Sequence, residues 1–460
     1  MPPKFGTSGL RGLVVELTPD LVADYTRAFL ASSDVGTGLF VGRDLRASSP
    51  DIAGVAIEAA RAEGVAVTDC GALPTPALAL AAMGQGAASL MITGSHIPDD
   101  RNGLKFYTPR GELTKAGEQG ILGALGRAPA GMAGSEVALN DHAGAAFVAR
   151  YVTAFGRDAL AGARVGVYSH SAVGRDLLIA TLEALGADVA ELGRSGRFIP
   201  VDTEAVDAAT RAQLASWAAG AGLDAIVSTD GDGDRPMVAD HAGRIVPGDV
   251  LGQITGAALG AEVAVTPVSS NTGVEAGGKF ARVIRTKIGS PFLIAAMEEA
   301  GGRVVGYEAN GGFLLGFDAE GPAGPLPALM TRDSHLPIIA PLVAARRVGL
   351  GLADLVAAEP PRFTAADRLQ EVPTEASQAL VARLIEDSDA RAAFLAEFGG
   401  AATGIDTTDG LRITLEGGRI VHLRPSGNAP EMRFYAEAES AEAAREFLAR
   451  GLDILANRLR

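Results

Sequence analysis

Residues 224–235 read DAIVSTDGDGDR, a short apolar run followed at once by acidic residues that alternate with glycine. Upstream of this stretch, from residue 164, short apolar runs alternate with longer segments of helical periodicity. Such alternation is typical of parallel β-strands that are covered by helices on both faces of a sheet. We therefore expect a strand–helix–strand–helix–strand unit over residues 164–229 that ends in a polar loop.

The same unit occurs three times in the chain. The first copy covers residues 39–96 and ends in Thr93-Gly94-Ser95-His96, and the third covers residues 263–312 and ends in Glu308-Ala309-Asn310-Gly311-Gly312. In open α/β sheets, ligands bind beyond the carboxyl ends of the strands. The three polar loops are thus predicted to face a shared cleft.

The last hundred residues have a different pattern. Apolar runs at 411–416 and 419–424 flank Gly417-Gly418, which is a hairpin signal, and a strand at 432–436 and an amphipathic helix at 441–459 follow. This pattern is typical of an α+β domain with antiparallel strands. The predicted fold class is therefore α/β, with three related α/β domains of mixed or parallel sheets and a C-terminal α+β domain. The predicted domain limits are 1–145, 146–246, 247–358 and 359–460.

Composition narrows the function class. The 460 residues carry a formal net charge of −15, which disfavours nucleic-acid binding because that needs a broad basic surface. Cys70 is the single cysteine, so an intrachain disulfide is impossible and a reducing compartment fits. The N-terminal residues lack the apolar stretch of a signal peptide, and no window approaches the length of a membrane span. We expect a cytoplasmic protein with no membrane or nucleic-acid partner.

Asp230, Asp232 and Asp234 form a candidate metal site. Glycine between them lets the chain curl so that alternate carboxylates converge, as a hard divalent cation requires. An EF-hand is excluded because Arg235 and His241 stand where that loop needs glycine and glutamate. A solvated acidic turn is the alternative, but three like charges on one turn repel each other unless a cation neutralises them. The expected ion is Mg²⁺.

Ser95 is a candidate nucleophile or phosphoryl carrier, because its hydroxyl follows the end of a predicted strand. A helix N-cap or turn serine is the alternative, and the absence of a G-x-S-x-G motif disfavours a hydrolase. Lys105, ten residues later, could return over this hydroxyl as a base or charge partner. Arg11 lies in a glycine-spaced loop whose amides could hold an oxyanion. Taken singly, His96, Lys105 and Arg11 also fit structural roles.

Residues 424–430 read RPSGNAP and follow the predicted hairpin. A guanidinium beside small hydrogen-bond donors on a turn suits a phosphate dianion. An ordinary turn is the alternative.

Together these motifs resemble the α-D-phosphohexomutase family, the phosphomannomutases and phosphoglucomutases, over nearly the whole chain. The resemblance implies three related α/β domains followed by a smaller α+β domain. It implies that Ser95 is the serine phosphorylated in the active enzyme and that it binds Mg²⁺ together with Asp230, Asp232 and Asp234. Residues that resemble the family's catalytic and substrate-binding groups are Arg11, His96 and Lys105 around the transferring phosphoryl group, Arg235, Lys287, Glu308 and Asn310 toward the substrate, and Arg424, Ser426, Gly427 and Asn428 at the non-reacting phosphate.

The implied reaction interconverts hexose 6-phosphate and hexose 1-phosphate through an enzyme-bound hexose 1,6-bisphosphate, with mannose as the first expected sugar and glucose as a second. The alternatives are a phosphoglucosamine mutase, a catalytically silent sugar-phosphate-binding protein and a metal-dependent phosphatase. The phosphorylated hexose is the expected partner, and the protein is expected to be a monomer or a homodimer.

The sequence departs from the family's patterns in three loops. The sugar loop commonly reads G-E-x-S-G-H, but Asn310 and Gly312 replace the serine and the histidine. The serine loop commonly reads T-A-S-H-N-P, but Gly94 and Ile97 stand here. In the phosphate loop, Asn428-Ala429 replaces the usual Thr-Glu. We expect these changes to leave the phosphoryl-transfer chemistry intact and to bear on the sugar specificity.

Overall fold

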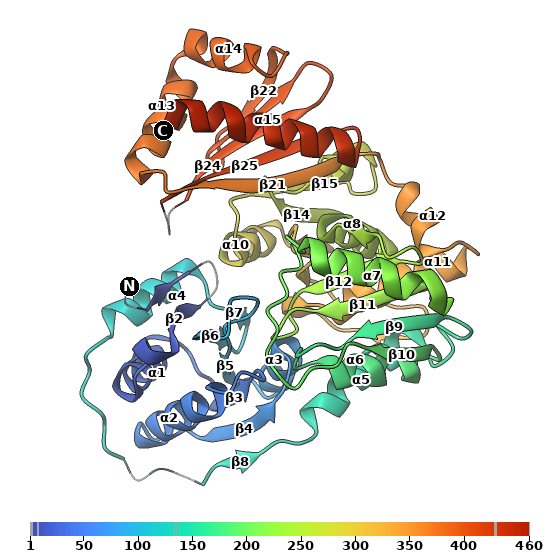
Figure 1. The fold of residues 1–460 in the computed structure, drawn as a ribbon. Helices are drawn as coiled ribbons and strands as arrows, with labels where there is room; N and C mark the ends of the chain where they lie inside the picture. Colours follow the sequence, from blue (N-terminus) through green and yellow to red (C-terminus); the bar gives the residue numbers. More distant parts are fainter. Residues whose placement is uncertain (1–2, 7–8, 133, 135, 427–429, 460) are drawn as a thin grey trace. The chain divides into compact units, whose positions relative to one another are not determined.

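The computed structural model describes residues 3–6, 9–132, 134, 136–426 and 430–459 (Figure 1). The chain forms two compact units: Met1–Ala264 with Gly289–Val356, and Val265–Ile288 with Ala357–Arg460.

The first α/β region of the first unit is built on a sheet with the strand order β1-β2-β6-β5-β3-β4-β8. β3 runs parallel to β4 and β5, whereas β6 returns antiparallel to β5. Its elements are β1 (Lys4–Phe5), β2 (Leu10–Leu13), the 3-10 helix η1 (Val14–Glu16), α1 (Pro19–Ser32), β3 (Leu39–Arg43), α2 (Ser49–Ala62), β4 (Val67–Ala72), α3 (Thr75–Gly84), β5 (Ala88–Ile92), β6 (Arg101–Thr108), β7 (Gly111–Glu112), α4 (Lys115–Gly123) and β8 (Ala138–Leu139).

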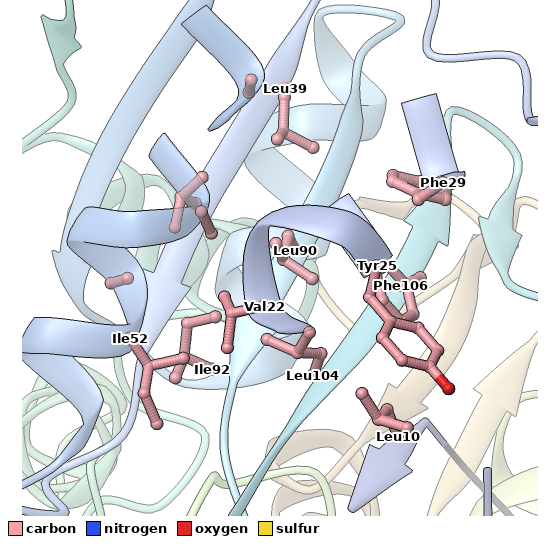
Figure 2. Close-up of a cluster of buried hydrophobic side chains, with 14 of the residues drawn as sticks. Leu10, Val22, Tyr25, Phe29, Leu39, Ile52, Leu90, Ile92, Leu104 and Phe106 are labelled. Carbon is pink, nitrogen blue, oxygen red and sulfur yellow. The ribbon is translucent and has the colours of Figure 1, made fainter. Parts of the chain in front are cut away.

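A hydrophobic core fixes β5 and β6 in this region. Val22 and Phe29 of α1, Ile52 of α2, Leu90 of β5 and Leu104 of β6 belong to one cluster of buried side chains, which Figure 2 shows. Burying a side chain of this kind contributes about 1.5–3 kcal/mol to folding. The loop between β5 and β6, which carries Ser95, is therefore anchored at both ends by the core.

The second α/β region repeats the pattern, with the strand order β10-β9-β11-β12-β13. β10, β9 and β11 are parallel, and β12 returns antiparallel to β11. Its elements are α5 (Ala143–Phe155), β9 (Arg164–Tyr168), α6 (Arg175–Ala184), β10 (Asp188–Leu192), α7 (Ala208–Ala221), β11 (Ala225–Thr229), β12 (Pro236–Asp240) and β13 (Ile245–Val246).

The remainder of the first unit contains a third polar loop between antiparallel strands β16 and β17, and β17 pairs in turn with β20. The elements here are α8 (Gly248–Ala258), α10 (Ser290–Ala300), β16 (Val304–Tyr307), β17 (Phe313–Leu315), β18 (Ala319–Glu320), β19 (Pro325–Leu326), β20 (Leu329–Asp333) and α11 (His335–Arg347). β14 (Val263–Pro267) and α12 (Leu352–Ala357) lie where the chain passes from one unit to the other.

The second unit contains an antiparallel sheet with the strand order β21-β25-β24-β23-β22. Phe394, Phe398, Phe434 and Phe447 lie in its core, between helices and the sheet. The elements are α9 (Gly273–Ala276), β15 (Arg282–Thr286), β21 (Phe363–Gln370), α13 (Thr374–Glu386), α14 (Ser388–Ala396), β22 (Ala402–Asp406), β23 (Leu411–Leu415), β24 (Ile420–Pro425), β25 (Glu431–Ala438) and α15 (Ala441–Leu459).

The predicted fold class is confirmed: α/β units with mixed sheets precede an antiparallel α+β region. The strands that follow the three polar loops, β6, β12 and β17, were not recognised in the sequence. Because each of them pairs antiparallel with the strand before its loop, each polar loop is the connection of a hairpin. The predicted limits of the four domains stay predictions.

Candidate active site

Ser95 lies in the β5–β6 loop, where its hydroxyl donates a 2.7 Å hydrogen bond to Asp230 Oδ2. Both residues are fully buried. The φ of Ser95 is 55°, in the left-handed region that a non-glycine residue adopts at an energetic cost. Thr93 Oγ1 accepts the Ser95 N–H at 2.7 Å and itself donates to Asp44, so the strained conformation is held in place.

Arg46 is the main support of this loop. Its guanidinium donates to the carbonyl oxygens of Ser95, Ile97 and Pro98 at 2.9, 2.6 and 2.8 Å, and its Nε lies 3.1 Å from Asp44 Oδ2. The side chain is fully buried. Arg46 therefore fixes the backbone of the loop at Ser95, Ile97 and Pro98.

Gly94 leaves the space that Arg46 occupies. A Cβ at position 94 would lie 2.7 Å from Arg46 Cζ, which is closer than real Cβ contacts. The ring of Phe198 also packs on the guanidinium, with its centroid 3.8 Å from Cζ. The departure of this loop from the family pattern at Gly94 thus has a packing reason.

Asp230, Asp232 and Asp234 follow β11 and offer oxygens that lie within 4.8 Å of one another. All three are fully buried. Burial, and then the negative charges of Asp232 and Asp234, raise the pKa of Asp230 well above its ordinary value. Among the described residues, Oδ1 of Asp232 and Oδ1 of Asp234 have no hydrogen-bond partner. Converging buried carboxylates with unused oxygens are the donor set of a hard divalent cation, so the residues present fit Mg²⁺.

Lys105 neutralises part of this acidic cluster. Its Nζ lies 2.6 Å from Oδ2 of Asp232 and 2.6 Å from Oδ2 of Asp234. Burial alone would raise the pKa of Asp232, but the Lys105 charge and hydrogen bond outweigh it and lower that pKa. The lysine reaches the site because β6 returns beside β5, where Lys105 is paired with Met91.

His96 stands between the serine hydroxyl and an arginine. Its Nδ1 lies 3.3 Å from Ser95 Oγ and 3.0 Å from Arg235 Nη1. Burial, and then the positive charges of Arg235 and Arg11, lower the pKa of His96 to about 2. The imidazole is therefore neutral at physiological pH and has an acceptor to offer to Arg235.

Arg11 adds a cation with unused donors. Among the residues that the structure describes, its Nε and Nη2 are buried and have no hydrogen-bond partner. Burial, and then the neighbouring Arg235, lower the pKa of Arg11 to about 10. Buried guanidinium donors that lack a partner are costly unless an anion binds them. The environment of Arg11 therefore suits a phosphoryl oxygen.

The sugar loop predicted at 308–312 connects β16 and β17 and is closed by the hydrogen bond from the N–H of Glu308 to the carbonyl of Gly312, at 3.1 Å. Oδ1 of Asn310 accepts the Gly312 N–H at 3.0 Å, and its carbonyl accepts from Thr203 Oγ1 at 2.8 Å. The side-chain oxygen of Asn310 is thus used to shape the loop. Glu308 is buried, and its Oε2 has no hydrogen-bond partner within the described part of the chain.

The second unit holds the other predicted phosphate-binding residues. Arg424 Nε donates to Asp409 Oδ2 at 2.9 Å, and the same oxygen accepts the N–H of Ile288 at 3.0 Å. Ile288 follows Lys287, which is exposed. One carboxylate therefore links the arginine of the RPSGNAP loop to the segment that carries the lysine.

The remaining residues of that loop are only partly described. Ser426 is buried, and its N–H donates to the carbonyl of Glu431 at 3.0 Å. Gly427 and Asn428 lie outside the described residues.

Comparison with known proteins identifies the family. The models of phosphoglucomutase/phosphomannomutase α/β/α domains I, II and III match residues 2–128, 146–243 and 246–363, and that of the C-terminal domain matches residues 369–453. The chain belongs to the phosphoglucomutase/phosphomannomutase family. It is therefore a phosphohexomutase, an enzyme that moves phosphate within a sugar phosphate.

Two relatives within this family are similar over their full length. A phosphomannomutase of Sinorhizobium fredii is 47% identical over 99% of both chains, and one of Salmonella muenchen is 40% identical over 96% of this chain and 93% of its own. A solved family member from Burkholderia thailandensis has the same fold, with a TM-score of 0.77 and 22% identity over 98% of this chain and 96% of that one. In the described part of the chain, no helix has the length and hydropathy of a membrane span.

Sequence reasoning missed Arg46, Asp409 and two further residues of the site: Arg332, whose Nη2 lies 3.0 Å from Asp234 Oδ2, and Glu112, whose Oε1 lies 3.0 Å from Arg332 Nε. Arg46 had a local signal, since Asp44-Leu45-Arg46 directly follows the apolar run that forms β3. Glu112, Arg332 and Asp409 have none, because each acts on a partner that is distant in sequence.

Proposed function

We propose that the protein is a phosphomannomutase that interconverts mannose 6-phosphate and mannose 1-phosphate, with the glucose phosphates as further substrates and Ser95 as the phosphoryl carrier. The proposal rests on the 2.7 Å hydrogen bond that Ser95 Oγ donates to Asp230 Oδ2, within a cluster of buried carboxylates and cations. The names of the two relatives with 47% and 40% identity support mannose as the sugar.

The proposed reaction begins with a phosphate on Ser95. The bond from phosphorus to the Ser95 oxygen breaks while a bond forms to the free hydroxyl oxygen of a hexose monophosphate. The proton of that hydroxyl is released, the Ser95 oxygen regains one, and a hexose 1,6-bisphosphate results. The bisphosphate then returns its other phosphate to Ser95, so the enzyme is regenerated and the phosphate has changed position on the sugar.

Asp230 is placed to handle the serine proton, because its Oδ2 already accepts the hydrogen bond of the hydroxyl. His96 is neutral and suits a role as an acceptor that orients Arg235, rather than as an acid. Phosphoryl transfer depends on positioning and on neutralising the charge of the phosphoryl oxygens. Arg11, Arg235 and Lys105 bring positive charge to the serine hydroxyl and its carboxylates.

Ser95, Asp230, Asp232 and Asp234 would hold the Mg²⁺. When bound, this ion supplies positive charge to the transferring phosphoryl group.

In the second unit, Arg424 and Lys287 would bind the phosphate that does not react, with Ser426, Gly427 and Asn428 in the same loop. Asp409 holds the Arg424 guanidinium through Nε. A charge-assisted hydrogen bond of this kind keeps a guanidinium in one orientation, as recognition of a phosphate requires. Glu308 and Asn310 would contact the sugar hydroxyls.

Replacing Ser95 with alanine tests the proposal. Activity with mannose 1-phosphate and glucose 1-phosphate, measured with a hexose bisphosphate activator, should be lost, and intact-mass measurement should show no phosphorylated enzyme. Ser89→Ala is the matched control, because Ser89 is a buried serine of β5 whose hydroxyl has no partner among the described residues. Near-normal turnover of the Ser95 variant would refute the carrier role.

The same assay distinguishes the alternative functions by the product that accumulates. A phosphoglucosamine mutase would prefer glucosamine phosphates, a phosphatase would release inorganic phosphate in place of the isomer, and a silent binding protein would show neither activity. The names of the relatives support phosphoglucosamine less than mannose phosphate. A cytoplasmic location and a monomeric or homodimeric state stay predictions.

A further inference from the structure

Arg332 is a buried cation that belongs to none of the motifs found in the sequence. It lies on β20 with 2% of its side chain exposed. Its Nε lies 3.0 Å from Oε1 of Glu112, its Nη2 3.0 Å from Oδ2 of Asp234, and its Nη1 3.8 Å from Oε2 of Glu308. One guanidinium thus faces a residue of β7, a residue of the metal loop and a residue of the sugar loop.

Glu112 fixes the position of this guanidinium. Its Oε1 also accepts the backbone N–H of Arg332 at 3.1 Å, and its Oε2 accepts the hydroxyl of Ser290 at 2.7 Å. Because Glu112 is buried and anchored on both oxygens, it holds the arginine rigidly. A guanidinium held by two carboxylates presents its remaining nitrogen in one direction, and that nitrogen faces Glu308.

Gly312 provides the space that the arginine needs. A Cβ at position 312 would lie 2.8 Å from Cδ and 3.0 Å from Cγ of Arg332. The φ of Gly312 is not in the left-handed region, so space and not backbone conformation requires glycine here. Any larger side chain at this position of the sugar loop is incompatible with Arg332 where it stands.

Glu308 is the residue on which this arrangement acts. Its Oε2 is buried without a hydrogen-bond partner among the described residues, and the 3.8 Å separation from Arg332 Nη1 is too long for a hydrogen bond. The arginine therefore lies near Glu308 Oε2 without a hydrogen bond to it, which leaves this oxygen able to accept a hydrogen bond from a ligand hydroxyl.

We propose that Arg332 is a positioning residue that determines sugar specificity: it holds the Glu308 side chain in place toward the sugar hydroxyls and couples the sugar loop to Asp234 of the metal loop. Gly312 is the residue that admits it. The inference rests on the proposed function, since it takes Glu308 as a contact of the sugar.

Arg332→Lys tests this role, because an ammonium keeps the charge but cannot reach three carboxylates at once. With mannose 6-phosphate we expect KM to rise about tenfold or more with a smaller change in kcat, and the preference for mannose over glucose phosphates to weaken. Arg150→Lys is the control: Arg150 is another buried arginine of the first unit, and it donates to the carbonyl of Pro327. Its variant should lose stability without a change in KM or preference.

A double-mutant cycle separates positioning from stability. If Arg332 acts through Glu308, Glu308→Gln should reduce kcat/KM strongly, and adding Arg332→Lys should reduce it little further. Gly312→Ala should raise KM in the same direction as Arg332→Lys. Additive effects, or an Arg332→Lys enzyme with unchanged KM and preference and only a lower Tm, would overturn the inference. Absence of mutase activity in the unaltered enzyme would instead refute the proposed function.

Discussion

Replacing Arg46 with methionine is expected to disable the serine loop. The change removes the hydrogen bonds to the carbonyls of Ser95, Ile97 and Pro98 and leaves Asp44 buried without its cation. Breaking a buried ion pair by removing one partner costs about 3–5 kcal/mol. We expect the free energy of unfolding to fall by about 4 kcal/mol and kcat to fall strongly, because the strained Ser95 loses its support.

Arg43→Met is the matched control, since it removes an arginine three residues away. Arg43 Nη1 lies 3.4 Å from Asp69 Oδ1, and both side chains are about one quarter exposed, at 27% and 24%. Partly exposed pairs of this kind contribute about 0–1 kcal/mol. Urea unfolding followed by circular dichroism, together with mutase turnover, compares the two variants. Equal losses of stability and activity would refute the role assigned to Arg46.

Three further substitutions test other features of the structure. Asp409→Asn should raise KM for the hexose phosphate about tenfold with little change in kcat, because the Arg424 guanidinium loses its charged partner. His335→Leu should make the free energy of unfolding less sensitive to acid. Burial lowers the pKa of His335 to about 3 in the folded protein, so below about pH 6.5 the unfolded chain binds a proton at this residue more readily than the folded one. At pH 5 this difference lowers the free energy of unfolding by about 2 kcal/mol. Gly451→Ala in α15 should destabilise by about 1–2 kcal/mol despite the better helix propensity of alanine, because the new Cβ would lie 2.2 Å from the ring of Phe434.

Each of these has its own check. Steady-state kinetics of Asp409→Asn beside Asp406→Asn, a change at the last residue of β22, should show the KM effect only in the first. Urea midpoints at pH 7 and pH 5 should differ less in the His335 variant, and an equal difference would count against the buried neutral imidazole. Gly54→Ala, in α2 with open space around its Cβ, should stabilise the protein, so a loss of stability there would contradict the packing argument.

Local patterns were enough to predict the strands and helices of the repeated units. Short apolar runs predicted β9 and β11, because a strand buried on both faces of its sheet is apolar along its whole length. Longer segments with helical periodicity predicted the helices between them. The return strand β12 was missed, since the predicted repeat unit ends with β11 and its polar loop. Its signal is weak because it follows the glycine-rich acidic loop directly, with Pro236 as its first residue.

The candidate site was predictable where several chemical groups are adjacent in the chain, as in Asp230, Asp232 and Asp234. The residues that hold those groups in place were not, because a supporting contact joins positions that are far apart. Arg332 and Glu112 are separated by 220 residues, and neither stands in a recognisable motif. Only the folded chain brings such partners together.

The fit between Gly312 and Arg332 also constrains the order in which this sequence can have evolved. An arginine at 332 in its present position requires glycine at 312, so a lineage that began with a bulkier residue in the loop had to lose it first or at the same time. Once Arg332 was present, replacing Gly312 with a larger residue would have produced a clash with its side chain. A larger residue at position 312 therefore requires that Arg332 shift or be replaced.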